Sequence, residues 1–124
     1  MNTAHLNFSK EHNIIKETII EGGKIALKWF NNKPNVWKKK DGTDVSEADI
    51  EIDNFLQLEL KKKIPNTGWL SEENKDDFSR LDYDKTLIVD PIDGTKSFLI
   101  GKKDFCIAIA LVKYGRPISA VIYN

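Results

Sequence analysis

The spacing of the apolar residues changes at Pro65, and this change constrains the fold more than any other feature of the sequence. Before Pro65, apolar side chains recur every three or four residues, which predicts helices. After it, they form short runs between charged or turn-forming residues, which predicts strands. We therefore expect an α+β fold with two N-terminal helices packed on a largely antiparallel sheet. At 124 residues, the chain suffices for one domain with a hydrophobic core.

The first predicted helix begins after Ser9, which is placed to cap it, and stops before Pro34. Its apolar positions at helical spacing are Ile15, Ile19, Ala26 and Phe30. The pair Gly22-Gly23 is expected to weaken the middle of this helix, because glycine lowers helix stability. A polar connection follows Pro34, and in it Asp41-Gly42 predicts a tight turn.

The second predicted helix begins after Ser46, which forms a short capping box with Asp49, and Pro65 ends it. Its apolar face consists of Ile52, Phe55, Leu56, Leu60 and Ile64. Four strands are then predicted, over residues 69–71, 86–89, 105–113 and 117–123. The last strand reaches Asn124 with no covering element after it. We expect either a truncated member of a larger fold or a chain that needs an obligate partner, such as a second copy.

The charge balance excludes some classes of partner. The 19 basic and 19 acidic side chains cancel, so no long-range field favours nucleic acid or an anionic membrane. The single cysteine, Cys106, cannot form an internal disulfide, and the longest apolar run is far too short to span a bilayer. We therefore expect a soluble cytoplasmic protein without membrane insertion and without a nucleic-acid partner.

Residues 89–95, which follow a β-rich run, contain two carboxylates. Asp90 and Asp93 could share or flank Mg²⁺, and the backbone carbonyl of Ile92 lies between them as a neutral ligand. Pro91 stiffens the turn, which would hold the carboxylates in place before a metal arrives. These residues predict a site for a hard cation at the end of a strand.

Gly94 and Thr95 come next and could bind an anion. Gly94 would let the backbone approach a ligand, and a short helix from Thr95 to Phe98 would point its amides at a phosphate. The alternative is that Asp-Pro and Asp-Gly are ordinary turn formers and that Thr95 only caps a helix. The residues alone leave both interpretations open.

Three further charged positions have a structural and a functional interpretation. Glu72 directly follows the strand at 69–71 and could be a ligand, whereas Glu73 is expected to belong to a solvated acidic loop. Asp49 in a first helical turn is favoured by the helix dipole, so a functional role requires a partner. The lysines at 38–40 form a solvated loop by default, or a phosphate clamp if that connection folds over the site.

Three segments together, residues 41–49, 69–73 and 90–98, resemble the inositol monophosphatase family in order and spacing. The resemblance covers the chain from about Trp37 onward and is most similar to the bacterial 3'(2'),5'-bisphosphate nucleotidase branch, with close variants in the inositol and histidinol phosphatase branches. It implies a layered αβαβα fold, of which residues 1–124 would be the N-terminal metal- and phosphate-binding half. The second half of that fold, which supplies a further metal-binding aspartate, is not in this sequence.

The resemblance also implies a function, that of a Mg²⁺-dependent phosphomonoesterase. Its substrate would be a small phosphorylated metabolite, 3'-phosphoadenosine 5'-phosphate or an inositol monophosphate, attacked by a metal-activated water. The alternative is a truncated, non-catalytic half-domain that binds metal or phosphate and needs a partner segment.

The resemblance assigns roles to individual residues. The metal ligands would be Glu72, Asp90, the carbonyl of Ile92, and Asp93. The catalytic residues would be Asp49, Thr95 and Glu72, with Thr95 and Asp49 paired to orient the attacking water. The phosphate and substrate would be bound by Asp93, Gly94, Thr95 and Lys38.

Overall fold

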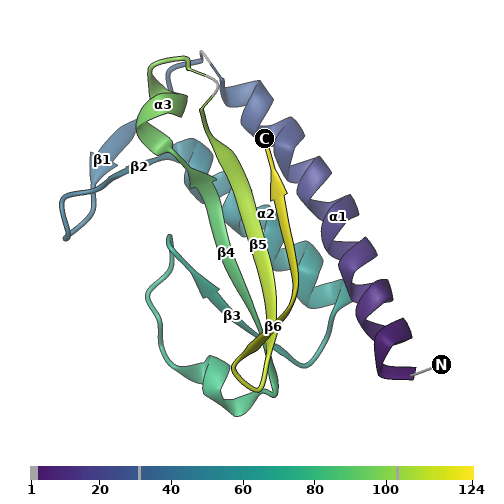
Figure 1. Cartoon of the computed structure of the whole chain (residues 1–124). Coiled ribbons are helices and arrows are strands. Elements are labelled where there is room, and N and C mark those ends of the chain that lie inside the picture. Colours follow the sequence, from purple (N-terminus) through teal and green to yellow (C-terminus); the bar gives the residue numbers. More distant parts are fainter. Residues whose placement is uncertain (1–2, 31, 103) are drawn as a thin grey trace.

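Two helices cover one face of a four-stranded sheet, and a small hairpin projects beside it (Figure 1). The structure is a computed structural model that describes residues 3–30, 32–102 and 104–124, with side chains from Lys10 onward. The helices are α1 (Thr3–Trp29) and α2 (Glu47–Lys63). The sheet has the order β3-β4-β5-β6. The predicted α+β class and the two-helix layer are confirmed.

The second helix begins and ends as the sequence predicts. Ser46 caps α2, and the backbone N–H of Ser46 donates to Asp49 Oδ2 at 2.8 Å while Asp49 N–H donates to Ser46 Oγ at 3.4 Å. This reciprocal capping box satisfies two donors that a helix start leaves unpaired. The helix ends at Lys63, two residues before Pro65.

The first helix differs from its prediction at its start. It begins at Thr3, so Ser9 lies inside the helix and is not its cap, and the side chain of Ser9 lies outside the described part. The helix also continues through Gly22 and Gly23. A Cβ on Gly22 would lie 3.3 Å from Leu56, and one on Gly23 would lie 2.4 Å from the ring of Tyr123. The two glycines therefore let α1 lie close to α2 and to β6.

Four strands form the sheet, and each predicted strand is present with somewhat different bounds. They are β3 (Thr67–Ser71), β4 (Lys85–Asp93), β5 (Cys106–Lys113) and β6 (Arg116–Tyr123). The β4–β5 and β5–β6 pairs are antiparallel, whereas β3 and β4 run parallel. A short 3₁₀ helix, Ser79–Asp82, lies in the charged loop between β3 and β4. The sheet is thus largely antiparallel, with one parallel pair at its edge.

A hairpin occupies the segment predicted as a polar connection. It pairs β1 (Val36–Lys38) with β2 (Asp44–Ser46). The predicted turn is present at its tip, where Gly42 has a φ of +86° and donates its N–H to the carbonyl of Lys39 at 2.9 Å. All three residues of β1 are exposed, so no apolar alternation marks the strand in the sequence.

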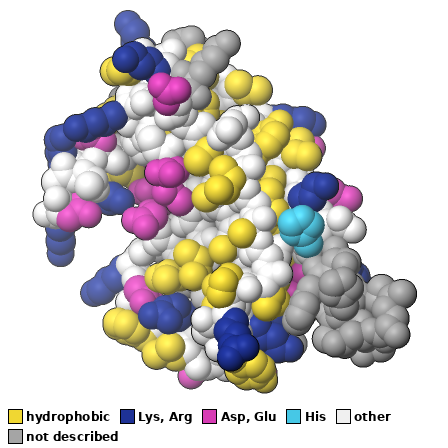
Figure 2. Space-filling model, viewed as in Figure 1, with side chains coloured by type: hydrophobic (Ala, Val, Ile, Leu, Met, Phe, Trp, Pro, Cys, Tyr) yellow, Lys and Arg dark blue, Asp and Glu magenta, His cyan; other side chains and the backbone are white. Residues whose placement is uncertain are grey.

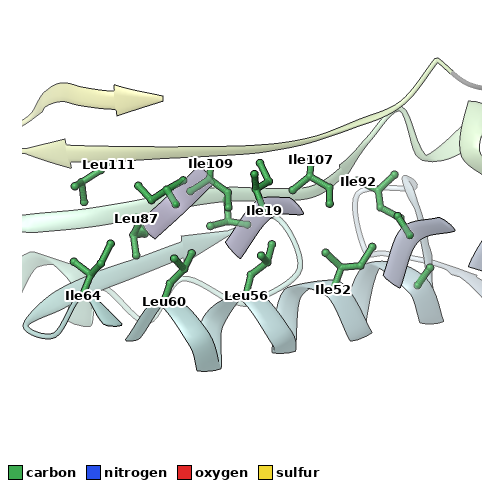
Figure 3. Packing of buried hydrophobic residues seen from close by; sticks show 14 of the residues in the cluster. Ile19, Ile52, Leu56, Leu60, Ile64, Leu87, Ile92, Ile107, Ile109 and Leu111 are labelled. Carbon is green, nitrogen blue, oxygen red and sulfur yellow. The ribbon is translucent and has the colours of Figure 1, made fainter. Parts of the chain in front are cut away.

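The core lies between the helices and the sheet (Figure 3). Ile52, Leu56 and Leu60 of α2 and its C-cap Ile64 face the sheet, where the facing residues are Leu87 of β4 and Ile107, Ile109 and Leu111 of β5. The alternate strand residues point to the opposite face of the sheet, where Ile88 and Ile122 are exposed. Within the described residues, no helix is long and apolar enough to cross a membrane.

Leu56 tests this packing, with Leu58 on the same helix as the matched control. Leu56 is fully buried, so Leu56→Ala should lower the free energy of unfolding by about 2–5 kcal/mol. Leu58 is 68% exposed, and Leu58→Ala should change it by less than about 0.5 kcal/mol. Urea denaturation followed by tryptophan fluorescence measures both. Equal effects of the two substitutions would contradict the orientation of α2.

Candidate metal and phosphate site

A cavity of about 450 Å³ lies where the C-terminal ends of β3 and β4 meet the β1–β2 hairpin. The hairpin and the short helix α3 (Thr95–Leu99) lie at this same end of the sheet (Figure 1). Acidic side chains gather near the hairpin with lysines around them (Figure 2). The lining residues are Lys38, Lys39, Asp41, Gly42, Thr43, Asp44, Glu72, Glu73, Asp90, Ile92, Asp93, Gly94, Thr95 and Lys96.

The parallel pairing brings the two acidic motifs together. Ser71, the last residue of β3, pairs with Val89 of β4, and Glu72 N–H donates to the carbonyl of Val89 at 3.3 Å. Glu72 therefore leaves β3 beside Asp90. The sequence indicated two strands that end in carboxylates, and the structure places these two strand ends side by side at the same end of the sheet.

Asp90 and Asp93 both line the cavity because β4 is irregular there. In a regular strand, residues three apart point to opposite faces. The register of β4 against β5 shifts between Asp90 and Asp93, and such a bulge turns the following side chains. Strand β4 also continues to Asp93, beyond the predicted end at Val89. Both aspartates thus belong to the strand rather than to a turn after it.

Negative charge is concentrated around Asp90. The pKa of Asp90 is raised to about 6, first by burial and then by the charges of Asp93, Glu72 and Asp49. A divalent cation would relieve this repulsion, and carboxylate and carbonyl oxygens are the ligands that Mg²⁺ prefers. The donor set therefore fits a hard cation chemically. In the described part of the chain, however, no three His, Cys, Asp or Glu side chains are already grouped as a metal site.

Asp49 has the partner that a functional role requires. The Thr95 hydroxyl lies 3.3 Å from Asp49 Oδ1 and 3.1 Å from the carbonyl of Ile92. The other oxygen, Oδ2, accepts from the Ser46 hydroxyl at 2.7 Å as well as from the Ser46 amide. Burial raises the pKa of Asp49, against the hydrogen bonds from Ser46 and Thr95. Asp49 thus serves the helix cap with one oxygen and faces Thr95 with the other.

Gly94 is constrained by the chain itself. Its φ is +90°, and a Cβ there would lie 2.5 Å from the carbonyl oxygen of Asp104. The backbone at Asp104 therefore leaves no room for a side chain at this position, while Gly94 itself lines the cavity. The predicted short helix is present and begins at Thr95, and Gly94 is its N-cap, the single residue between β4 and α3.

Two lysines of the hairpin take different positions. Lys38 forms an ion pair with Asp44 at 2.7 Å, and its side chain is 68% exposed. Lys39 is only 27% exposed, and its Nζ donates to the carbonyl of Glu72 at 3.2 Å and lies 3.7 Å from the Glu73 carboxylate. Of the lysines at 38–40, sequence reasoning selected Lys38 for the site and not Lys39. The exposed strand β1 gives no alternation that would have separated them.

Glu73 was assigned to a solvated loop, and this assignment is wrong. Its side chain is 5% exposed, and Oε2 has no hydrogen-bond partner among the described residues. Its pKa is raised to about 7, first by burial and then by the charge of Asp49, while Lys39 opposes the rise. The Glu73 carboxylate lies near the charges of Asp49 and Asp90 and 3.7 Å from Lys39, so its burial depends on other segments and the loop's own polar composition does not reveal it.

Comparisons with known proteins identify close similarity over nearly the whole chain. The model of the inositol monophosphatase family matches residues 9–124. An inositol-1-monophosphatase from Rhizobium meliloti (strain 1021) is 32% identical over 114 residues, which are 90% of this chain and 42% of that protein. The 3'(2'),5'-bisphosphate nucleotidase CysQ from Haemophilus influenzae is 33% identical over 105 residues, 83% of this chain and 39% of that protein.

A solved structure agrees with the fold. The crystal structure of the extragenic suppressor protein suhB from Bartonella henselae has a TM-score of 0.82 and 31% identity, over 90% of this chain and 44% of that one. The chain thus spans about two fifths of the length of the curated relatives it matches. Its α+β arrangement corresponds to a fragment of that larger fold.

The buried carboxylate of Glu73 predicts a pH dependence of stability without metal. Because its pKa rises from 4.5 to about 7 on folding, the native state holds this proton more tightly than the unfolded state. Stability should fall as pH rises through that interval, and Glu73→Gln should remove on the order of 1–2 kcal/mol of the change. Urea denaturation in EDTA from pH 4.5 to 8 measures it. Identical pH slopes for the parent and the variant would disprove it.

Proposed function

The chain belongs to the inositol monophosphatase family, and we propose that residues 1–124 form the N-terminal metal- and phosphate-binding half of a phosphomonoesterase. The observation that carries the proposal is the meeting of Glu72, Asp90 and Asp93 in one cavity beside the Thr95–Asp49 pair. The substrate would be a small phosphorylated metabolite. Relatives named inositol-1-monophosphatase and 3'(2'),5'-bisphosphate nucleotidase suggest an inositol monophosphate or 3'-phosphoadenosine 5'-phosphate.

The proposed cofactor is Mg²⁺. Glu72, Asp90 and the carbonyl of Ile92 would hold one ion, and Asp90 with Asp93 would hold a second. When bound, such ions activate water for attack and neutralise charge on the phosphate ester and its leaving oxygen. The crowded negative charge at Asp90 supports this assignment, because a cation would offset the repulsion among the carboxylates.

Thr95 and Asp49 would orient the attacking water. The Thr95 hydroxyl has one proton, and donating it to Asp49 leaves the oxygen lone pairs free to accept from a water. Asp49 is fully buried and is held by Ser46, so the acceptor that Thr95 faces is fixed. Glu72, which also lines the cavity, would share the task of holding the water in place.

The phosphate would lie against the start of α3. The first amides of a helix have no partner within it, so the amides at Gly94 and Thr95 are placed to donate to phosphate oxygens. Asp93 borders the same space, and Lys38 of the hairpin would add a positive charge. With the free Cys106, a reducing cytoplasm remains the proposed location.

A second candidate function is metal and phosphate binding without turnover. Its support is that the matched relatives are more than twice as long and that Ile88 and Ile122 are exposed on the outer face of the sheet. A further segment or a second copy of the chain would then have to pack on this face before hydrolysis occurs.

Phosphate release from inositol 1-phosphate and from 3'-phosphoadenosine 5'-phosphate distinguishes the two candidates. With Mg²⁺ we expect turnover that EDTA abolishes and that Asp90→Asn lowers at least about 100-fold, because Asp90 would contact both ions. Calorimetry should show weaker Mg²⁺ binding in the same variant. Mg²⁺ binding that depends on Asp90 without any turnover favours the second candidate, and no Mg²⁺ binding contradicts both.

Lys38 and Lys40 form a matched pair of exposed lysines, of which only Lys38 lines the cavity. Lys38→Gln should raise the dissociation constant of inorganic phosphate about two- to fivefold in the presence of Mg²⁺, since exposed charge pairs contribute modestly. Lys40→Gln should leave it unchanged. Calorimetric titration with phosphate measures both constants. A Lys40 effect equal to that of Lys38 would show that only general charge matters.

A further inference from the structure

A second buried aspartate on α2 lies outside the cavity. Asp53 is 1% exposed and accepts a hydrogen bond from Ser71, which is itself 5% exposed. The other oxygen, Asp53 Oδ2, has no hydrogen-bond partner among the described residues. A buried carboxylate that is only partly satisfied lowers stability, and an apolar side chain would extend the core at this position. The bond from Ser71, which joins α2 to the end of β3, is therefore the contact through which Asp53 acts on the strand.

The hydrogen bond to Asp53 orders the end of β3. A carboxylate accepts only, so the Ser71 hydroxyl donates to Asp53 and keeps a lone pair free. That lone pair accepts the backbone N–H of Glu73 at 3.2 Å. The carbonyl of Ser71 accepts the N–H of Asn74 at 3.3 Å. Asp53 thus fixes the direction of the Ser71 hydroxyl and, with it, the turn that follows the strand.

The backbone on both sides of Glu72 is held as a result. Its N–H donates to the carbonyl of Val89 at 3.3 Å, and its carbonyl accepts from Lys39 at 3.2 Å. The next amide, that of Glu73, is bound by Ser71. With these groups bonded, the direction in which the Glu72 side chain leaves the backbone toward the cavity is set.

The two buried aspartates of α2 act on neighbouring strand ends. Asp49 and Asp53 are four residues apart, so they lie on the same side of the helix. Asp49 faces the hydroxyl of Thr95 just after β4, and Asp53 accepts from the hydroxyl of Ser71 at the end of β3. One helix therefore holds both acidic segments of the cavity relative to each other.

We propose that Asp53 is a positioning residue that acts through Ser71 to hold Glu72 in the direction required to bind a divalent cation. This assignment rests on the proposed function, because it takes Glu72 as a metal ligand. Groups that do not bind the metal but orient a metal ligand through hydrogen bonds typically affect metal affinity by about 10- to 100-fold.

Mn²⁺ binding to the chain tests the assignment, measured by loss of the electron paramagnetic resonance signal of the free ion. Asp53→Leu and Ser71→Ala both remove the hydrogen bond, and we expect each to raise the Mn²⁺ dissociation constant at least about tenfold. Asp53→Asn keeps an oxygen that accepts from Ser71 but removes the charge, so its constant should stay within about threefold of the parent. Urea denaturation of each variant gives its folded fraction, so that Mn²⁺ affinities are compared for folded protein; Asp53→Leu is expected to lose some stability because it leaves the buried Ser71 hydroxyl without its acceptor.

Several outcomes would overturn the assignment. Unchanged Mn²⁺ affinity in folded Ser71→Ala, or a loss that only follows the unfolded fraction, would show a purely structural role. A loss in Asp53→Asn as large as that in Asp53→Leu would assign the effect to charge. If the parent binds no Mn²⁺, or Asp90→Asn binds it equally well, the proposed function fails too. If Asp90→Asn loses binding and Ser71→Ala does not, only the role of Asp53 fails.

Discussion

The parallel pairing of β3 with β4 is the constraint on which the candidate site depends. Parallel strands end at the same edge of a sheet, so the acidic residues that follow β3 meet those that end β4. An antiparallel pair would have put Glu72 and Asp90 at opposite ends. The irregular register near Asp93 then turns a second carboxylate of β4 toward the same space. The direction of the strands thus determines where the acidic residues meet, and the individual side chains then determine the chemistry of the cavity.

Helix α2 connects the hydrophobic core to this acidic edge. Leu56 and Leu60 pack against the sheet, and the same helix carries Asp49 and Asp53 toward the strand ends. Burial raises the pKa of both aspartates, which shows that the chain holds them where their charged forms are disfavoured. The chain has no net charge, yet it concentrates acidic side chains where β3 and β4 end. The packing of α2 on the core determines where two of them, Asp49 and Asp53, lie.

The sequence predicts the elements whose apolar residues are periodic. The strands around the core are predicted correctly because burial imposes a regular spacing on their apolar residues. The capping box at Ser46 is predicted correctly because its Ser and Asp are three residues apart. The hairpin escapes prediction because β1 is exposed and polar. The burial of Glu73 beside Asp49 and Asp90 and the contacts of Lys39 with Glu72 and Glu73 join segments far apart in the sequence, so local composition does not predict them. Strand direction at β3 is likewise a tertiary property, because the residues of a short strand do not specify their partner.

Asp49 divides its two oxygens between tasks that belong to different levels of the structure. One oxygen completes the start of α2 at Ser46, and the other meets the Thr95 hydroxyl in the cavity. A replacement that keeps only one acceptor in the right place would lose either the helix start or the contact with Thr95. Substitution at this position is therefore restricted by two requirements, the start of α2 and the contact with Thr95. A side chain that meets only one of them loses the other.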